Sequence, residues 1–128
     1  MGLACGNEKN TRAEAIELLE RISRLDVNGS HDARAAALEA IEAMPLREPA
    51  LVAARKQCMT AHGGLLEAER AQHEVEQQLE QSPRPIDAAK LEALKARMAK
   101  ANAALQAAGE ALAPCEESTR ELALRYAR

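Results

Sequence analysis

The sequence predicts an all-α protein, in which a long antiparallel, coiled-coil-like helical hairpin carries two shorter N-terminal helices packed on it as in a helix bundle. The composition is the first indication: the chain is 47% hydrophobic and 29% charged but has no Trp, no Phe and one Tyr. Its apolar residues are mostly Ala and Leu, which is typical of helices and coiled coils. No stretch alternates with period two, whereas apolar residues recur at steps of three and four, so we expect helices and no sheet.

Size and charge narrow the class further. A chain of 128 residues has room for one core, so we assign residues 1–10 to a flexible leader and residues 11–128 to a single helical domain. The net charge of -3 argues against a nucleic-acid-binding protein, which needs a basic face. No apolar run approaches the ~20 residues of a transmembrane helix.

The first helix is predicted over about 11–25. Thr11 followed by Glu14 fits a capping box, in which hydroxyl and carboxylate satisfy free amides at a helix start. Asn28 and Gly29 are expected to end the helix, because both accept the left-handed conformation of a helix terminus. The apolar stripe consists of Ala15, Leu18, Leu19, Ile22 and Leu25.

A second helix is predicted over about 32–44. Ser30 or Asp32 can cap it, and Pro45 closes it. Its apolar stripe consists of Ala37, Leu38, Ile41 and Met44.

Two long helices should follow. Pro49 suits the first turn of a helix over 49–81, which Gly63 and Gly64 interrupt with a bend or a close approach to a neighbour.

The segment 82–85 (Ser-Pro-Arg-Pro) breaks the chain, and Asp87 can cap the next helix, predicted over 87–113. Pro114 removes a backbone donor and disfavours helical geometry before it, so we expect a kink there or a restart as a fifth helix over 115–127.

Two series of positions predict how the long helices pair. Folding the chain near 83–85 stacks the series in antiparallel register, with Cys58 opposite Cys115 and Gly64 opposite Gly109. Large residues then oppose small ones, as closely spaced helices require. The first series is Leu51, Ala54, Cys58, Ala61, Leu65, Ala68, Gln72, Val75 and Leu79. Its partners, in the same order, are Leu122, Thr119, Cys115, Leu112, Ala108, Leu105, Ala101, Met98 and Leu94.

The facing cysteines predict a disulfide and an oxidising compartment. Core positions of a tight helical pair can bring the α-carbons of Cys58 and Cys115 within the roughly 4.4–6.8 Å that a disulfide needs. The alternative is two buried free thiols that act as small apolar side chains.

The third cysteine lies in the leader, in Leu3-Ala4-Cys5-Gly6. This tetrapeptide resembles the lipobox at the end of a bacterial lipoprotein signal. The resemblance implies lipid attachment at Cys5 and, with Gly6 after it, sorting to the outer membrane by the enterobacterial rule. Position 2 carries Gly where a larger aliphatic residue is usual, and the charged and apolar regions of a signal are missing. Both departures are explained if Met1 stands in place of a removed signal peptide.

A metal or haem site is the alternative chemistry. Cys58 and His62 are one helical turn apart, and Met59 and His73 lie on the same long helix, an arrangement that helical bundles use to bind metals. However, CxxC, CxxCH and HExxH motifs are missing. We place His31 at a helix start and the other two histidines on solvated faces, and therefore assign no metal ligand and no cofactor.

Catalysis has little support in the sequence. The glutamates fall at the spacing of solvated helical faces, and neither a phosphate-binding loop nor a nucleophile–base arrangement is visible. We therefore predict that the protein is not an enzyme. Gln72, the one polar member of its series, is interpreted as a register-fixing residue or an edge position.

These observations favour a small envelope lipoprotein, anchored through Cys5 on the periplasmic face, that acts as a spacer or binds another envelope protein. A lipid anchor would be its only contact with the membrane. The second hypothesis is a cytoplasmic helical interaction protein, such as a secretion chaperone, an immunity protein or a coiled-coil regulator, with reduced thiols. Homodimerisation stays open, because a two-helix seam leaves other apolar faces to cover.

Overall fold

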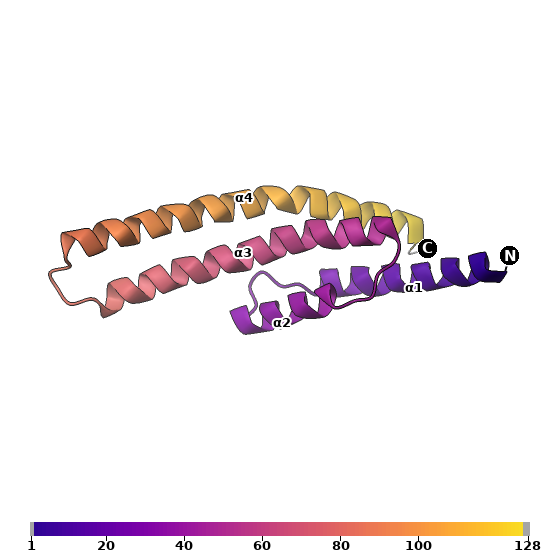
Figure 1. The fold of residues 1–128 in the computed structure, drawn as a ribbon, viewed down its shortest axis with the longest axis horizontal. Helices are drawn as coiled ribbons and strands as arrows, with labels where there is room; N and C mark the ends of the chain where they lie inside the picture. The colour runs from indigo at the N-terminus through magenta and orange to yellow at the C-terminus, as the bar shows by residue number, and fades with distance from the viewer. Residues whose placement is uncertain (1, 127–128) are drawn as a thin grey trace.

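A computed structural model describes the backbone of residues 2–126 and the side chains of residues 8–126. Within these residues the chain forms helices and no strand, which confirms the all-α class. The long helices α3 and α4 form an antiparallel hairpin, and α1 and α2 lie along one side of the half that contains the start of α3 and the end of α4 (Figure 1). The helices are α1 (Gly2–Ser23), α2 (His31–Glu42), α3 (Pro49–Gln81) and α4 (Ala88–Tyr126).

The first helix is longer than the sequence analysis predicts. α1 begins at Gly2, so the predicted helix start at Thr11 is wrong, and the backbone of residues 2–10, which we assigned to a flexible leader, is helical. No proline lies between Gly2 and Thr11 to end the helix. The amides that a capping box at Thr11 would satisfy are inside α1, where an α-helix pairs each amide with the carbonyl four residues earlier.

The turn after α1 also differs from its prediction. The helix ends at Ser23, and none of the described residues has a positive φ, so a left-handed stop at Asn28 and Gly29 is wrong. Asp26 organises the turn instead. Its carboxylate accepts the amide of Asn28 at 2.9 Å, and its carbonyl accepts the amide of Gly29 at 2.9 Å. A short acidic side chain that bonds its own backbone two residues on is a common turn device.

Ser30, one of the two residues predicted to cap this helix, is the N-cap of α2. Its hydroxyl accepts the amide of Ala33 at 3.1 Å, which satisfies one of the free amides at the helix start. The helix begins at His31 and ends at Glu42, close to the predicted span of 32–44.

The C-terminal end of α2 is held by an arginine of α3 that the sequence analysis does not single out. A guanidinium at a helix C-terminus satisfies carbonyls that have no partner within the helix and complements the helix dipole. This contact therefore ties the end of α2 to the side of α3. Nη1 of Arg55 donates to the carbonyls of Ile41 at 3.5 Å, Glu42 at 3.3 Å and Met44 at 2.6 Å.

The predicted span of 49–81 for the third helix is confirmed by α3, which passes through both glycines without a break. The loop after it contains a cis peptide bond between Arg84 and Pro85. The carboxylate of Asp87 then accepts the amide of Lys90 at 3.2 Å, which confirms Asp87 as the cap of the fourth helix.

The last helix is continuous. α4 runs from Ala88 to Tyr126 with Pro114 inside it, so a restart as a separate helix over 115–127 is wrong. A proline in a helix interior removes one hydrogen bond and costs roughly 3 kcal/mol. Pro114 is exposed, so the carbonyl that loses its donor can bond to water, while Cys115 on the buried face is covalently joined to α3. We attribute the continuity of α4 to these two features.

The seam between α3 and α4 follows the predicted series closely. On α4 the buried members recur at each seventh position, and the members between them are half-buried, as in a heptad repeat. The pairing is therefore that of an antiparallel coiled coil. The buried members are Leu51, Ala54, Cys58, Ala61, Ala68 and Val75 on α3, and Leu94, Ala101, Ala108, Cys115 and Leu122 on α4.

The glycines pair differently from the prediction. A β-carbon added at Gly64 would lie 3.0 Å from the β-carbon of Ala108, whereas Gly109 has nothing within 4 Å. The expected pairing of Gly64 with Gly109 is therefore wrong by one residue, because the side of α4 that meets α3 at this level carries Ala108. Leu65 is only half-buried, and Leu66 is buried in its place.

The main core lies where α1 and α2 cover the hairpin. It is formed by residues of every helix, so it joins the two short helices to the two long ones. Beyond the start of α2 the hairpin continues toward its loop as α3 and α4 alone (Figure 1). The buried residues of this core are Ala15, Leu18, Ile41, Met44, Leu51, Ala54 and Leu122.

The shared core makes a prediction about stability. Leu51 is fully buried in it, so Leu51→Ala should lower the free energy of unfolding by about 2–5 kcal/mol. The neighbouring Val52 is 38% exposed, and Val52→Ala should change it by less than about 1 kcal/mol. Urea denaturation followed by circular dichroism measures both values, and equal losses would contradict the assignment of this core.

Candidate functional site

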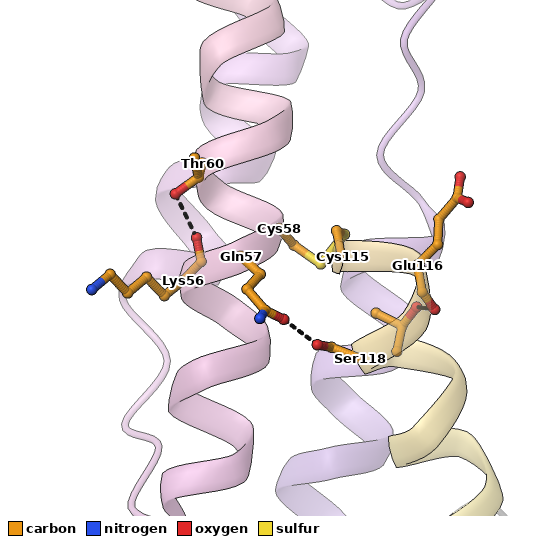
Figure 2. Close-up of a disulfide and its surroundings, with 8 residues drawn as sticks. Lys56, Gln57, Cys58, Thr60, Cys115, Glu116 and Ser118 are labelled. Atoms are coloured by element: carbon orange, nitrogen blue, oxygen red, sulfur yellow. Dashed lines mark hydrogen bonds between the residues drawn. A yellow bond between two sulfur atoms is a disulfide. The ribbon is translucent and has the colours of Figure 1, made fainter. Parts of the chain in front are cut away.

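Cys58 of α3 and Cys115 of α4 form the disulfide that the register predicts. Their sulfur atoms are 2.06 Å apart and their α-carbons 4.7 Å apart. The two residues are 1% and 2% exposed. The bond therefore crosses the interior of the seam and not its surface (Figure 2).

Three helices surround the disulfide. Ala61 is buried beside it, and Ile22 of α1 packs against the same cluster, together with Ala111 and Leu112 of α4. The apolar side chain of Ile22 thus helps to cover a bond that joins α3 to α4.

A polar contact crosses the seam next to the disulfide. Ser118 of α4 donates its hydroxyl hydrogen to the side-chain carbonyl of Gln57 on α3 (Figure 2). Gln57 is one position from Cys58, and Ser118 is three positions from Cys115. The disulfide and the hydrogen bond therefore join the two helices at the same level of the hairpin.

Loss of the disulfide should destabilise the fold strongly. It joins residues 57 positions apart, and closing a loop of this length restricts the unfolded chain by up to about 4 kcal/mol in the chain-entropy treatment. The double variant Cys58→Ala, Cys115→Ala should therefore unfold at lower urea concentration, by about 2–4 kcal/mol in free energy. Reduced wild-type protein is the matched control and should show a similar loss. An unchanged urea midpoint in both samples would show that the clamp contributes nothing.

A buried ion pair joins α2 to α3 on the same half of the molecule. The side chain of Arg34 is 8% exposed, and its Nη1 lies 2.5 Å from Oε2 of Glu69. That oxygen makes no well-aligned hydrogen bond, so the contact is an ion pair in character. Sequence reasoning missed it, although Arg34 lies four and seven residues before Leu38 and Ile41 and thus on the apolar face of α2.

His62 lies at the same junction. It is half-buried and lines a small hollow with Arg34 and Leu38 of α2 and with residues of the turn after α1. Burial lowers the pKa of His62, the nearby charge of Arg34 lowers it further, and Glu116 of α4 opposes the shift. The expectation that His62 occupies a solvated face is therefore wrong, because α2 covers this side of α3.

The other two histidines meet across helices. His31, at the start of α2, and His73, exposed on α3, have ring centroids 6.2 Å apart in an edge-on arrangement. Arg70 of α3 donates to the carbonyl of His31 at 3.3 Å and lies 3.5 Å from the carboxylate of Asp32. These contacts hold the first turn of α2 against α3.

Gln72 is half-buried, and its partner is not the residue predicted to face it. Its side-chain amide donates to the side-chain carbonyl of Asn102 at 2.7 Å, one position beyond Ala101. Further toward the loop, Arg97 donates to Gln78 at 2.9 Å. Polar pairs thus link α3 and α4 along the part of the hairpin that the short helices leave uncovered.

The metal ligands considered in the sequence analysis do not form a cluster. Cys58 is bonded to Cys115, and among the side chains of residues 8–126 no group of three or more His, Cys, Asp or Glu could hold a metal ion. Cys5, the predicted site of lipid attachment, belongs to α1 by its backbone, but its side chain lies outside the described residues.

Comparison of the chain with protein-family models, with curated proteins and with solved structures gives no match. Within the described residues, no helix has both the length and the apolar character that crossing a membrane requires.

The environment of His62 predicts a pH dependence of stability. Its folded-state pKa lies below the ordinary value near 6.5, so the unfolded chain binds the proton more readily. His62 thus contributes stability that is present above about pH 6.5 and is lost as the pH falls below it. His62→Gln should flatten the fall in the free energy of unfolding between about pH 7 and pH 5. His73→Gln, on an exposed position, is the control. The prediction fails if both variants show the same pH slope.

Proposed function

We propose that this protein is a helical lipoprotein of the bacterial cell envelope, anchored through Cys5, which acts on the periplasmic face as a spacer or a protein-binding module. Its mechanism is recognition by helix faces and not chemistry. The observation that carries the proposal is the buried disulfide between α3 and α4.

The disulfide supports the proposed location in the periplasm, which is an oxidising compartment. Disulfides persist in oxidising environments such as the bacterial periplasm, whereas the cytosol of most organisms keeps thiols reduced. The bond uses Cys58 and Cys115. Of the three cysteines in the chain, Cys5 alone is then left for another use, and it stands in the tetrapeptide that resembles a lipobox.

The elongated shape of the molecule supports the proposed role as a spacer. The N-terminal turns of α1, which contain Cys5, project past the open end of the hairpin, and the loop between α3 and α4 lies at the opposite end (Figure 1). With 33 residues, α3 alone is roughly 50 Å long. A lipid on Cys5 would therefore hold one end of the molecule at the membrane and present the loop end far from it.

The uncovered part of the hairpin supports binding. Between the start of α2 and the loop, α3 and α4 have no other helix beside them (Figure 1). Paired helix faces of this kind bind amphipathic helices of partner proteins in many complexes. We propose another envelope protein as the partner at this end.

The test uses the protein isolated from its source cells. We expect it in the envelope fraction, released by detergent. Its mass without reductant should fit a lipid on Cys5 and lack two hydrogens for the Cys58–Cys115 bond. Recombinant protein made in a reducing cytosol is the control for free thiols. Native protein recovered in the soluble fraction with three free thiols would overturn the proposal in favour of the cytoplasmic interaction protein.

A further inference from the structure

A continuous groove runs along the hairpin between α3 and α4. Three adjoining hollows form it, the largest about 590 Å³. One of the two smaller hollows shares Ala53 and Gln57 with the other. That second hollow shares Thr60 and Ala111 with the largest one. We call this surface the seam groove and define it by Ala53, Thr60, Ala71, Ala104, Ala107 and Ala111.

The seam groove lies on the side of the hairpin that the short helices do not cover. α1 meets α4 at Glu116, Thr119 and Ala123, whereas the groove is lined on that stretch of α4 by Ser118 and Glu121. These two sets of positions belong to different faces of one helix. The structure therefore leaves the second face of the hairpin open.

The lining favours another pair of helices as the occupant. Seven of the twelve residues that line the largest hollow are alanines, and Gly64 lies among them. Small side chains allow helices to approach at the short end of the usual 8–10 Å interaxial distance. A face of this shape accepts a second helical surface with equally small side chains, and the groove itself is such a surface.

The charges along the groove select a second copy of this chain. Lys56 and Glu67 on α3 and Lys100 and Glu121 on α4 line the groove and are exposed. None of these four forms an ion pair within the part of the chain that the structure describes. α3 thus presents one cation and one anion without an ion pair to this face. α4 presents Lys100 and Glu121 together with Arg125, which also forms no ion pair in the described part of the chain.

The four charges are arranged with the symmetry of a dimer. On α3 the midpoint between Lys56 and Glu67 falls just after Ala61, and on α4 the midpoint between Lys100 and Glu121 falls just before Ala111. Both points lie about one helical turn from the disulfide, on its loop side, and therefore at nearly the same level of the hairpin. An antiparallel copy related by a two-fold axis at this level places each of the two lysines opposite a glutamate.

We propose that the seam groove is the interface of an antiparallel homodimer, in which α3 packs on α3 and α4 packs on α4 of a second copy around this two-fold axis. Lys56 then faces the partner's Glu67, and Lys100 faces the partner's Glu121. Because a two-fold interface is self-complementary, each pair occurs twice. The interface is independent of the compartment proposed above.

The two remaining cations of the groove have contacts within their own chain. Arg97 lies 3.1 Å from the carboxylate of Glu74. The guanidinium of Arg125 lies 5.1 Å from the centroid of the Tyr126 ring. The same two-fold axis brings Arg97 near the partner's Arg125, and Glu74, paired with Arg97, offsets part of that like charge. The register therefore rests on the Lys56–Glu67 and Lys100–Glu121 pairs.

The first test is the mass in solution, with an exposed alanine of the groove changed to glutamate. By light scattering at about 100 μM, the wild-type protein should show about twice the chain mass of 13.8 kDa. Ala107→Glu places a charge inside the interface and should give the chain mass. Ala99→Glu, exposed on α4 and outside the groove, is the control and should remain dimeric. A monomeric wild-type protein, or an Ala107→Glu variant that stays dimeric, overturns the proposal.

The second test is charge reversal, which checks the register. Lys56→Glu and Glu67→Lys each create two like-charge contacts and should raise the dimer dissociation constant at least about tenfold. The double variant exchanges the charges and should restore it to within about threefold. Circular dichroism of each variant checks that the helices are intact. If the double variant is as weak as the single ones, Lys56 and Glu67 do not meet across the interface, and this antiparallel register is wrong.

Discussion

The heptad seam between α3 and α4 is the constraint on which the rest of the structure depends. Its buried positions alternate with half-buried ones along α4 and along α3 after Ala61, and the disulfide between Cys58 and Cys115 joins the two helices of the seam at one level. A shift of the register would separate the cysteines. It would also place side chains larger than Ala108 opposite Gly64, where the two helices are already close. The covalent bond and the packing therefore specify the same alignment, and each makes the other more effective.

Several local features that look unfavourable are explained by this seam. Pro114 stands inside α4, but its exposed position leaves the buried face of the helix intact. The two glycines inside α3 weaken an isolated helix by about 1 kcal/mol each, yet a β-carbon at Gly64 would lie only 3.0 Å from the β-carbon of Ala108 on α4. Local helix propensity is thus overruled where pairing of the two long helices requires it.

The short helices depend on the hairpin for their position. Arg55 of α3 donates to the carbonyls of Ile41 and Glu42 at the end of α2, and Arg34 of α2 lies against Glu69 of α3. These two contacts fasten α2 near both of its ends, while α1 packs mainly through apolar residues. As a result one face of the hairpin is covered and the other is left with a groove lined by alanines. The covered face gives the protein its stability, and the open face is where we place its interface.

The sequence alone was sufficient for the features that arise from local chemistry and from periodicity. These are the helical class, the span of α3, the caps at Ser30 and Asp87, and the register that pairs the cysteines. Prolines, capping side chains and a repeat of apolar residues at steps of three and four act over a few residues, so they can be recognised in the sequence alone. Only the tertiary structure decided the rest. It showed that α1 extends to Gly2, that α4 continues through Pro114, that Gly64 meets Ala108 and that α2 partly covers His62. Most of these results depend on which face of a helix is covered by another helix. If the covered face shifts by one residue, different side chains become buried, although the order of apolar and polar residues in the sequence is the same.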